Sequence, residues 1–181
     1  MTGVKAGASK FGLTPEDRCV DSVVMIAVGQ RLNLDFNLKV VQGAIEREVS
    51  FESLLTRPTI VSVYMRNNTP GCDRQNESLV SHAAEFDEAG YNLVAVSRDA
   101  CGSHQKYSAK QGIDDVLASD PEDRFAIATD SVVEKSMYGR KFTGPARAAY
   151  GIARDGTVLA VVPKVDPKDH AEQLRAVLPR L

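Results

Sequence analysis

Hydrophobic residues along the chain gather in two short runs that are typical of buried β-strands. Residues 59–65 read Thr-Ile-Val-Ser-Val-Tyr-Met and residues 91–97 read Tyr-Asn-Leu-Val-Ala-Val-Ser, and neither run carries a charge. Such runs suit strands that are covered on both faces. Between them, residues 76–89 carry apolar side chains at helical spacing and stop at Gly90, which can end a helix. This order predicts a parallel βαβ unit with a right-handed crossover.

Shorter elements are predicted on both sides of this unit. We expect strands within residues 35–49 (two strands around Gln42-Gly43), 116–119, 148–153 and 157–163, and helices at residues 50–55, 102–111, 121–129 and 167–178. The last two strands are joined by Arg154-Asp155-Gly156, and the Asp-Gly pair is a strong hairpin signal. The pattern predicts the α/β class, with a central mixed β-sheet flanked by helices and a β-hairpin at its N-terminal end.

Composition and charge are those of an ordinary globular chain. The 181 residues are 43% hydrophobic and 25% charged, as in folded rather than disordered proteins. Lys and Arg number 22 and Asp and Glu number 24, a net charge of −2, so a nucleic acid or an anionic membrane has no electrostatic support as a partner. The apolar run at residues 23–28 is too short to cross a bilayer. We predict one domain over residues 23–181, preceded by a flexible extension at residues 1–22.

The cysteines are Cys19, Cys72 and Cys101. Their odd number and wide spacing do not fit a secreted disulfide framework. We therefore expect a reducing, cytoplasmic compartment, in which a cysteine that matters is more often reactive than structural. Cys19 falls in the predicted extension and is interpreted as incidental.

Three segments read as similar helix starts, and one of them carries a cysteine. Residues 120–123 and 166–169 both read Asp-Pro-x-Asp, that is, an N-cap acceptor, a proline at the first helical position and a carboxylate two positions later. Thr69-Pro70-Gly71-Cys72 follows the same order, with Cys72 at the place of the carboxylate. The helix dipole and unpaired N–H groups favour an anion there, which predicts a thiolate with a lowered pKa. The alternative is a buried, inert cysteine that happens to begin a helix.

Cys101 and the histidines are further candidates for chemistry. Cys101 follows the second buried strand, so it should open at the same edge of the sheet as Cys72, and the two thiols could meet after a local rearrangement; the alternative is a small residue that merely begins a helix. The sequence has no Cys-x-x-Cys pair. His82, His104 and His170 fall on three different predicted helices and are expected to be partly solvated. We expect neither a metal nor a cofactor.

Several longer motifs accompany Cys72 along the chain. Residues 64–72 read Tyr-Met-Arg-Asn-Asn-Thr-Pro-Gly-Cys. Further motifs are Val-Ser-Arg-Asp at 96–99, Ser-His at 103–104, Ser-Asp-Pro at 119–121, Tyr-Gly at 138–139 and Gly-Pro-Ala-Arg-Ala-Ala-Tyr at 144–150. In this order they resemble the motifs of peroxiredoxins of the bacterioferritin comigratory protein (PrxQ) type, within the AhpC/TSA-like thioredoxin-fold superfamily. The resemblance covers about residues 28–178.

The resemblance implies a thioredoxin-like fold and a thiol-dependent peroxidase for hydrogen peroxide and organic hydroperoxides. Cys72 would be the peroxidatic cysteine that becomes a sulfenic acid, Arg147 the arginine beside it, and Thr69 the hydroxyl that hydrogen-bonds the peroxide. The sulfenic acid would become a disulfide that thioredoxin or a similar thiol reduces, in a monomer or homodimer serving antioxidant defence and redox homeostasis. Two alternatives stay open: a redox sensor on the same fold, and a thiol–disulfide oxidoreductase, which the missing Cys-x-x-Cys pair disfavours.

The chain departs from the family pattern at three positions. Met65 stands where the family usually has a proline, and Glu77 and Ser108 stand where different members carry their resolving cysteine. We therefore take Cys101 as the preferred resolving cysteine within the chain. The alternative is a one-cysteine mechanism in which an external thiol attacks Cys72.

Overall fold

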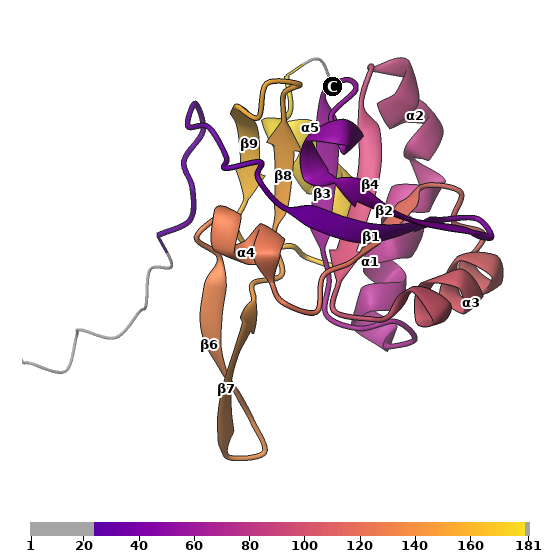
Figure 1. Ribbon diagram of the computed structural model, residues 1–181, viewed down its shortest axis with the longest axis vertical. Coiled ribbons are helices and arrows are strands. Elements are labelled where there is room, and N and C mark those ends of the chain that lie inside the picture. Colours follow the sequence, from indigo (N-terminus) through magenta and orange to yellow (C-terminus); the bar gives the residue numbers. More distant parts are fainter. Residues whose placement is uncertain (1–23, 180–181) are drawn as a thin grey trace, which may run out of the picture.

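The computed structural model describes residues 24–179 and contains a seven-stranded β-sheet (Figure 1). The strands of this sheet, in spatial order, are β2 (Ile45–Ser50), β1 (Asn37–Gln42), β5 (Val116–Ser119), β4 (Asn92–Ser97), β3 (Thr59–Val63), β8 (Ala149–Ile152) and β9 (Val158–Val162). The three central strands run parallel, and the outer pairs β1–β2 and β8–β9 are antiparallel hairpins. The predicted mixed sheet with an N-terminal hairpin is confirmed.

The centre of the sheet forms because β3 and β4 are apolar on both faces. All five residues of β3 are buried, and β3 pairs with β4 from Thr59 opposite Asn92 to Val63 opposite Val96. Parallel neighbours need a crossover, and helices α1 (Pro70–Ser81) and α2 (Ala83–Glu88) supply it. The predicted βαβ unit is confirmed, and the carboxyl ends of both strands lie at one edge of the sheet.

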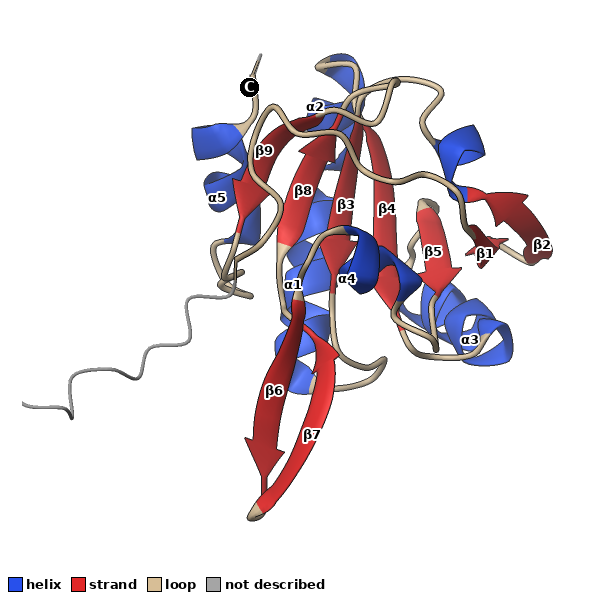
Figure 2. Ribbon diagram, turned by 60° about the vertical axis from the view of Figure 1, so that its left-hand side comes forward, coloured by secondary structure: helices blue, strands red, loops and turns tan. Residues whose placement is uncertain are grey.

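Helices cover both faces of the sheet (Figure 2). The remaining helices are η2 (Phe51–Leu54), α3 (Cys101–Gln111), α4 (Arg124–Ala128) and α5 (His170–Val177). On one face, α1, α2 and α5 bury Leu79, Phe86 and Leu174 against Ile60 of β3, and α3 packs on β1 and β5. On the other face, η2 and α4 contribute Phe51 and Phe125, among other residues, to a second core with Val61 and Val63. Alternate residues of β3 therefore point to opposite cores.

The helix predicted at residues 76–89 is two helices. They are separated at His82, which leaves the helical conformation (φ −118°, ψ 9°). The ring Nδ1 of His82 lies 2.8 Å from the carbonyl oxygen of Ser78, the acceptor that the His82 N–H would use in a continuous helix. Competition of the side chain for this carbonyl explains the break.

The predicted helix starts at Asp120 and Asp166 are wrong. Helices α4 and α5 begin later, with Asp123 and Asp169 as N-caps. The Asp120 carboxylate accepts hydrogen bonds from two N–H groups, those of residues 124 and 125, at 2.8 and 2.9 Å. It therefore caps α4 although it lies three residues before the N-cap residue Asp123. The Asp166 carboxylate instead accepts from the N–H of Lys168 at 2.9 Å, a local turn that holds these residues out of the helix.

A third hairpin, β6 (Val132–Met137) and β7 (Arg140–Pro145), was not predicted from the pattern. It projects from the body of the molecule (Figure 1). Tyr138 and Gly139 form its turn with φ of 51° and 74°, as a tight two-residue turn of this hairpin type requires. Most of its side chains are exposed, and one of the half-buried positions of β6 is the charged Lys135, so the sequence lacks the apolar–polar alternation that marks a half-buried strand.

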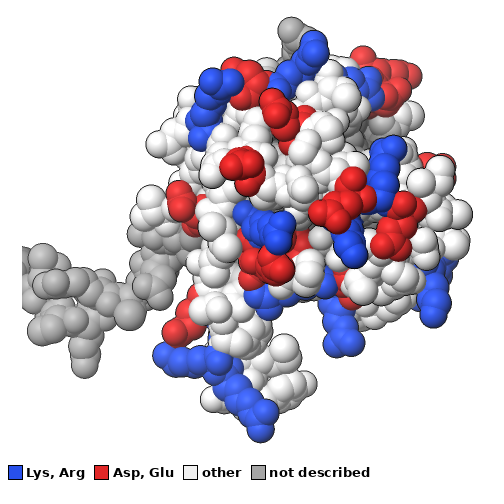
Figure 3. Space-filling view, in the orientation of Figure 1, with Lys and Arg blue, Asp and Glu red and all other residues white. Residues whose placement is uncertain are grey.

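Charge is distributed unevenly over the face drawn in Figure 3. Acidic and basic side chains are interspersed over the body, whereas basic side chains gather on the projecting β6–β7 hairpin. No helix among residues 24–179 is long and apolar enough to cross a membrane. The extension predicted at residues 1–22, with Cys19, lies outside the described residues and stays a prediction.

Candidate active site

Cys72 lies in the first turn of α1, after the loop that follows β3. Thr69 is the N-cap with an extended backbone (φ −119°, ψ 139°), and Pro70 is the first helical residue. Proline suits this position because the helix start has no use for its missing N–H. Cys72 is the third helical residue and its side chain faces inward, with 0% exposure. The helix start predicted here is confirmed.

The Cys72 sulfur is surrounded by groups that favour its thiolate. Burial raises the pKa of the thiol. Hydrogen bonds from the Thr69 hydroxyl and from the backbone of Arg66 and Met65 lower this pKa, and the charge of Arg147 lowers it further. The lowering contributions outweigh burial, so the pKa lies below its ordinary value. The Thr69 hydroxyl also donates to the carbonyl oxygen of Arg66 at 2.9 Å, and rotation lets it serve either partner.

Arg147 reaches Cys72 from a distant part of the chain. It lies two residues before the start of β8, which pairs with β3, and the N–H of Val63 donates to the carbonyl oxygen of Ala148 at 2.9 Å. This pairing sets Arg147 beside the loop after β3. Its Nη2 lies 3.4 Å from the Sγ of Cys72. A Cβ at Gly71 would lie 3.7 Å from the same nitrogen, an ordinary van der Waals distance, so Gly71 lies directly against the guanidinium.

A row of buried polar side chains holds Arg147 from behind. Its Nη1 donates to Oε1 of Gln75 at 2.7 Å. The Gln75 amide donates to the Ser62 hydroxyl at 2.9 Å and to the carbonyl oxygen of Val63 at 3.1 Å. The Ser62 oxygen is 2.9 Å from Nε2 of His170. Because each member is buried and paired, the row fixes the orientation of the guanidinium.

Two of the three histidines are buried, contrary to expectation. His104 and His170 are 0% exposed, whereas His82 is partly exposed. Nδ1 of His104 lies 3.2 Å from Nδ2 of Asn67, and burial lowers the pKa of both rings. The expectation failed because their helices are polar in sequence and give no sign of which face packs inward. Within residues 24–179, no three His, Cys, Asp or Glu side chains are grouped to hold a metal ion.

Stability is expected to fall as the pH is lowered from 6.5 towards 4, because His170 folds in its neutral form. Burial, and then the charge of Arg147, lower the pKa of His170 from 6.5 to about 4. In this window the unfolded chain binds a proton that the folded chain does not, so the free energy of unfolding decreases by about 2 kcal/mol at pH 5. Urea unfolding at pH 7.5 and 5.0 measures the loss. His170→Gln should lose about 2 kcal/mol less than wild type over this interval, and equal losses would contradict the assignment.

Cys101 lies among other residues than those that surround Cys72. It is the first residue of α3, 6% exposed, and lines a pocket of 480 Å³ with Glu46 of β2. Burial, and then the charge of Glu46, raise the pKa of its thiol. Helix α3 meets the surroundings of Cys72 through Tyr107 instead, six residues further along the helix, or about 9 Å at the helical rise. The structure thus groups the other three predicted site residues and leaves Cys101 apart, with both thiols free.

A cavity of 1170 Å³ opens beside the guanidinium of Arg147. Apolar side chains from the N-terminal segment and from the β6–β7 hairpin line it, among them Met25, Val133 and Phe142. Met65, which precedes the Cys72 loop, lines it as well. The buried sulfur of Cys72 therefore lies behind an arginine that faces an apolar cavity.

Comparison with known proteins assigns this arrangement to a family. A model described as AhpC/TSA family matches residues 28–161. The chain belongs to this family. The peroxiredoxin Bcp of Xanthomonas campestris pv. campestris is 34% identical over 119 residues, which are 66% of this chain and 74% of that protein.

Solved structures agree with the sequence comparison. Xanthomonas campestris peroxiredoxin Q matches with a TM-score of 0.73 at 28% identity, covering 82% of this chain and 94% of that one. The bacterioferritin comigratory protein of the same organism, in trapped intermediate and ligand complexes, matches with a TM-score of 0.73 at 28% identity over 83% and 96% of the two chains. The chain is a peroxiredoxin of the Bcp/PrxQ type, a peroxide-reducing oxidoreductase with a thioredoxin-like fold. The expected family, fold and enzyme class are confirmed.

Several residues of this peroxiredoxin's site were not identified from the sequence. Gln75 had a signal, because it follows Cys72 by three residues on a helix and such residues are neighbours. Ser62 and His170 had no such signal in the sequence, since their role depends on the packing of β3 against α5. Lys135 also had no signal in the sequence, because it lies on the β6–β7 hairpin, which the pattern did not predict.

Proposed function

We propose that this peroxiredoxin reduces hydroperoxides by direct attack of the Cys72 thiolate on a peroxide oxygen. An S–O bond forms as the O–O bond breaks, the sulfur loses two electrons and becomes a sulfenic acid, and the leaving oxygen takes up a proton to depart as water or an alcohol. The observation that carries the proposal is the buried sulfur at a helix start with the Arg147 Nη2 at 3.4 Å. A thiolate and a fixed cation are the two groups that this reaction needs.

Arg147 and Thr69 have separate roles in this proposal. The guanidinium stabilises the thiolate before the reaction and the charge that develops on the peroxide oxygens as their bond breaks. Its hydrogen bond to Gln75 leaves Nη2 pointing at the reacting sulfur. The Thr69 hydroxyl hydrogen-bonds the bound peroxide, since it lies beside the sulfur and can rotate away from Arg66.

The proposed substrates are hydrogen peroxide and organic hydroperoxides. The solved structure of the Xanthomonas campestris bacterioferritin comigratory protein is described in terms of its alkyl peroxide reduction activity. The cavity beside Arg147 supports the same class here, because its volume of 1170 Å³ and its apolar lining would accommodate an alkyl group.

Cys101 is proposed to close the cycle by attacking the Cys72 sulfenic acid, with loss of water and formation of a disulfide. Both cysteines lie in the first turn of a helix, and first turns open at the lowest cost. In this proposal both turns unwind, because the Cys101 thiol lies near Glu46 whereas the Cys72 sulfur lies near Arg147. If the two turns do not unwind, an external thiol attacks the sulfenic acid in place of Cys101.

The experiment that tests both steps uses one equivalent of hydrogen peroxide per chain without a reductant, followed by intact mass and peptide mapping. We expect Cys72 to be the oxidised residue and a Cys72–Cys101 disulfide to accumulate. In Cys101→Ser, the sulfenic acid on Cys72 should persist and be trapped by dimedone. Oxidation elsewhere would overturn the proposed function, whereas a stable sulfenic acid or a mixed adduct in the wild type would overturn only resolution by Cys101.

The wider setting is proposed as follows. Thioredoxin or a similar thiol reduces the disulfide, and the protein serves antioxidant defence in the cytoplasm as a monomer or homodimer. Residues 23–181 act as one domain. The near balance of 22 basic and 24 acidic residues supports neither nucleic acid nor a membrane surface as a partner.

A further inference from the structure

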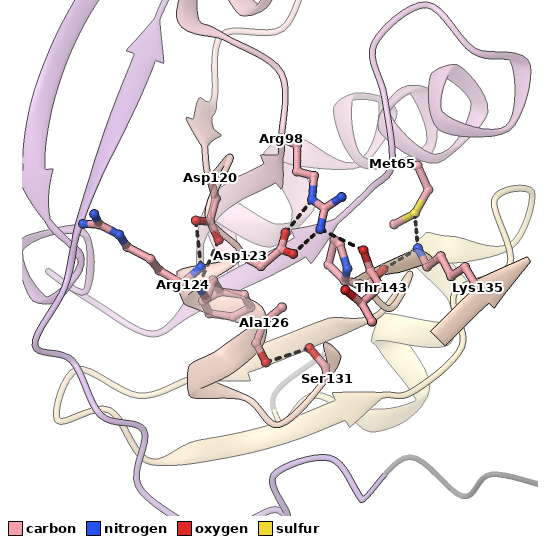
Figure 4. Close-up of polar contacts among 11 residues, drawn as sticks. Met65, Arg98, Asp120, Asp123, Arg124, Ala126, Ser131, Lys135 and Thr143 are labelled. Carbon is pink, nitrogen blue, oxygen red and sulfur yellow. Dashed lines mark hydrogen bonds and ion pairs between the residues drawn. The ribbon is translucent and has the colours of Figure 1, made fainter. Parts of the chain in front are cut away.

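Lys135 of β6 places a half-buried ammonium group between two segments of the active site (Figure 4). Its Nζ contacts the Sδ of Met65. The same nitrogen donates to the carbonyl oxygen of Pro145, the last residue of β7. Basic side chains elsewhere on this hairpin are exposed, for example Lys141, which pairs with Glu134 at 2.9 Å. Lys135 is therefore distinguished from its neighbours by its burial and its partners.

The two partners of Lys135 belong to the segments that present the Cys72 sulfur with its donors. The backbone of Met65 and Arg66 hydrogen-bonds the sulfur. Pro145 lies two residues before Arg147, whose Nη2 contacts the same sulfur. One ammonium group thus contacts both segments that present groups to the Cys72 sulfur.

A second cation fixes the hairpin beside this contact. Arg98 donates to the carbonyl oxygen of Thr143 at 3.1 Å and to the Asp123 carboxylate (Figure 4). Its guanidinium also lies over Gly144, where a Cβ would come within 3.4 Å. The base of β7 is therefore held by Arg98 at residues 143–144 and by Lys135 at residue 145. These contacts attach the base of the hairpin to the body of the protein. The position of Lys135 relative to the loop after β3 is therefore fixed.

The charge of Lys135 also acts on the reacting sulfur. Burial lowers the pKa of Lys135, and the charges of Arg147 and Arg98 lower it further, whereas Asp123 and Cys72 raise it. The attraction between Lys135 and Cys72 is mutual, so the ammonium form stabilises the thiolate.

We propose that Lys135 is a positioning residue for the oxidation of Cys72, linking the Met65 side chain to the strand end that presents Arg147. The inference rests on the proposed role of Cys72 in peroxide reduction, and it adds Lys135 to the residues that support this reaction. It also gives Met65 a function: a proline there would offer the ammonium group no side-chain acceptor, whereas the thioether sulfur does. A small displacement of either segment would move a donor away from the sulfur, and reactions of this kind are sensitive to shifts of an ångström.

The test compares the first oxidation of Cys72 in wild type, Lys135→Met, Lys135→Arg and Lys141→Met. Competition with horseradish peroxidase for hydrogen peroxide gives the rate constant, and alkylation of Cys72 followed by peptide mapping gives its pH midpoint. We expect Lys135→Met to slow the reaction about tenfold and Lys135→Arg to restore most of the rate. The pH midpoint should move upward in Lys135→Met alone. Lys141→Met, on the same hairpin, should match the wild type.

Two results would overturn the inference: a Lys135→Met rate and pH midpoint equal to the wild type, or a slower rate with an unchanged midpoint and no recovery in Lys135→Arg. Thermal unfolding of each variant guards against a loss of folding. Met65→Leu keeps the volume and removes the sulfur, so it should slow the reaction less than Lys135→Met and add nothing to it in the double variant. A wild-type protein whose Cys72 is not oxidised would instead overturn the proposed function.

Discussion

Replacement of Cys72 by serine is expected to abolish the turnover of hydrogen peroxide, with a loss of at least about three orders of magnitude. Serine keeps the shape of the side chain, but its hydroxyl stays protonated near neutral pH and cannot form a sulfenic acid. In the wild type, Thr69 and Arg147 lower the pKa of the Cys72 thiol against the effect of burial, so the thiolate form is more accessible than in an ordinary cysteine. Peroxide consumption in excess dithiothreitol, corrected for the reagent alone, measures the loss.

The matched control is Cys101→Ser, which removes a thiol that lies near Glu46 rather than near Arg147. Its Cys72 should be oxidised by the first equivalent of peroxide as fast as in the wild type. Thermal unfolding should show both variants to be folded, because serine occupies nearly the same volume as cysteine. Sustained peroxide turnover by folded Cys72→Ser would show that another group performs the chemistry.

Arg147→Met is expected to slow the oxidation of Cys72 about a hundredfold, the typical cost of losing a preorganised donor at a developing charge. Methionine matches most of the length of arginine but carries no charge. The loss has two sources: the thiolate is no longer stabilised before the reaction, and the oxygens are not stabilised as their bond breaks. Since the charge of Arg147 lowers the pKa of the Cys72 thiol, the pH midpoint for alkylation of Cys72 should move upward in the variant.

Arg154→Met is the control for Arg147→Met. Arg154 is exposed in the turn after β8, at the other end of the strand from Arg147. Its replacement should leave both the rate constant and the alkylation midpoint unchanged. If Arg147→Met behaved in the same way, the guanidinium at 3.4 Å from Cys72 would have no part in the reaction.

The strands at the centre of the sheet could be predicted because their local sequence pattern is typical of buried strands. Thr59–Val63 and Asn92–Ser97 are uncharged and rich in β-branched residues, and both are strands. The β6–β7 hairpin could not be predicted in this way, because most of its side chains are exposed and one of its half-buried positions is the charged Lys135, so the sequence shows no apolar–polar alternation. The helix starts at Asp120 and Asp166 failed for a related reason: a carboxylate can cap a turn as well as a helix, and the local sequence does not distinguish the two.

The sequence by itself determined the position of Cys72 at a helix start, because an N-cap, a proline and the residues after them act within one turn of the backbone. It also determined the family, through several short motifs in one order. Only the tertiary structure decided which groups meet the sulfur. Arg147 arrives through the pairing of β8 with β3, Lys135 through the attachment of the β6–β7 hairpin, and Cys101 is turned towards Glu46. These contacts join residues far apart along the chain, and their distances depend on packing that no local pattern encodes.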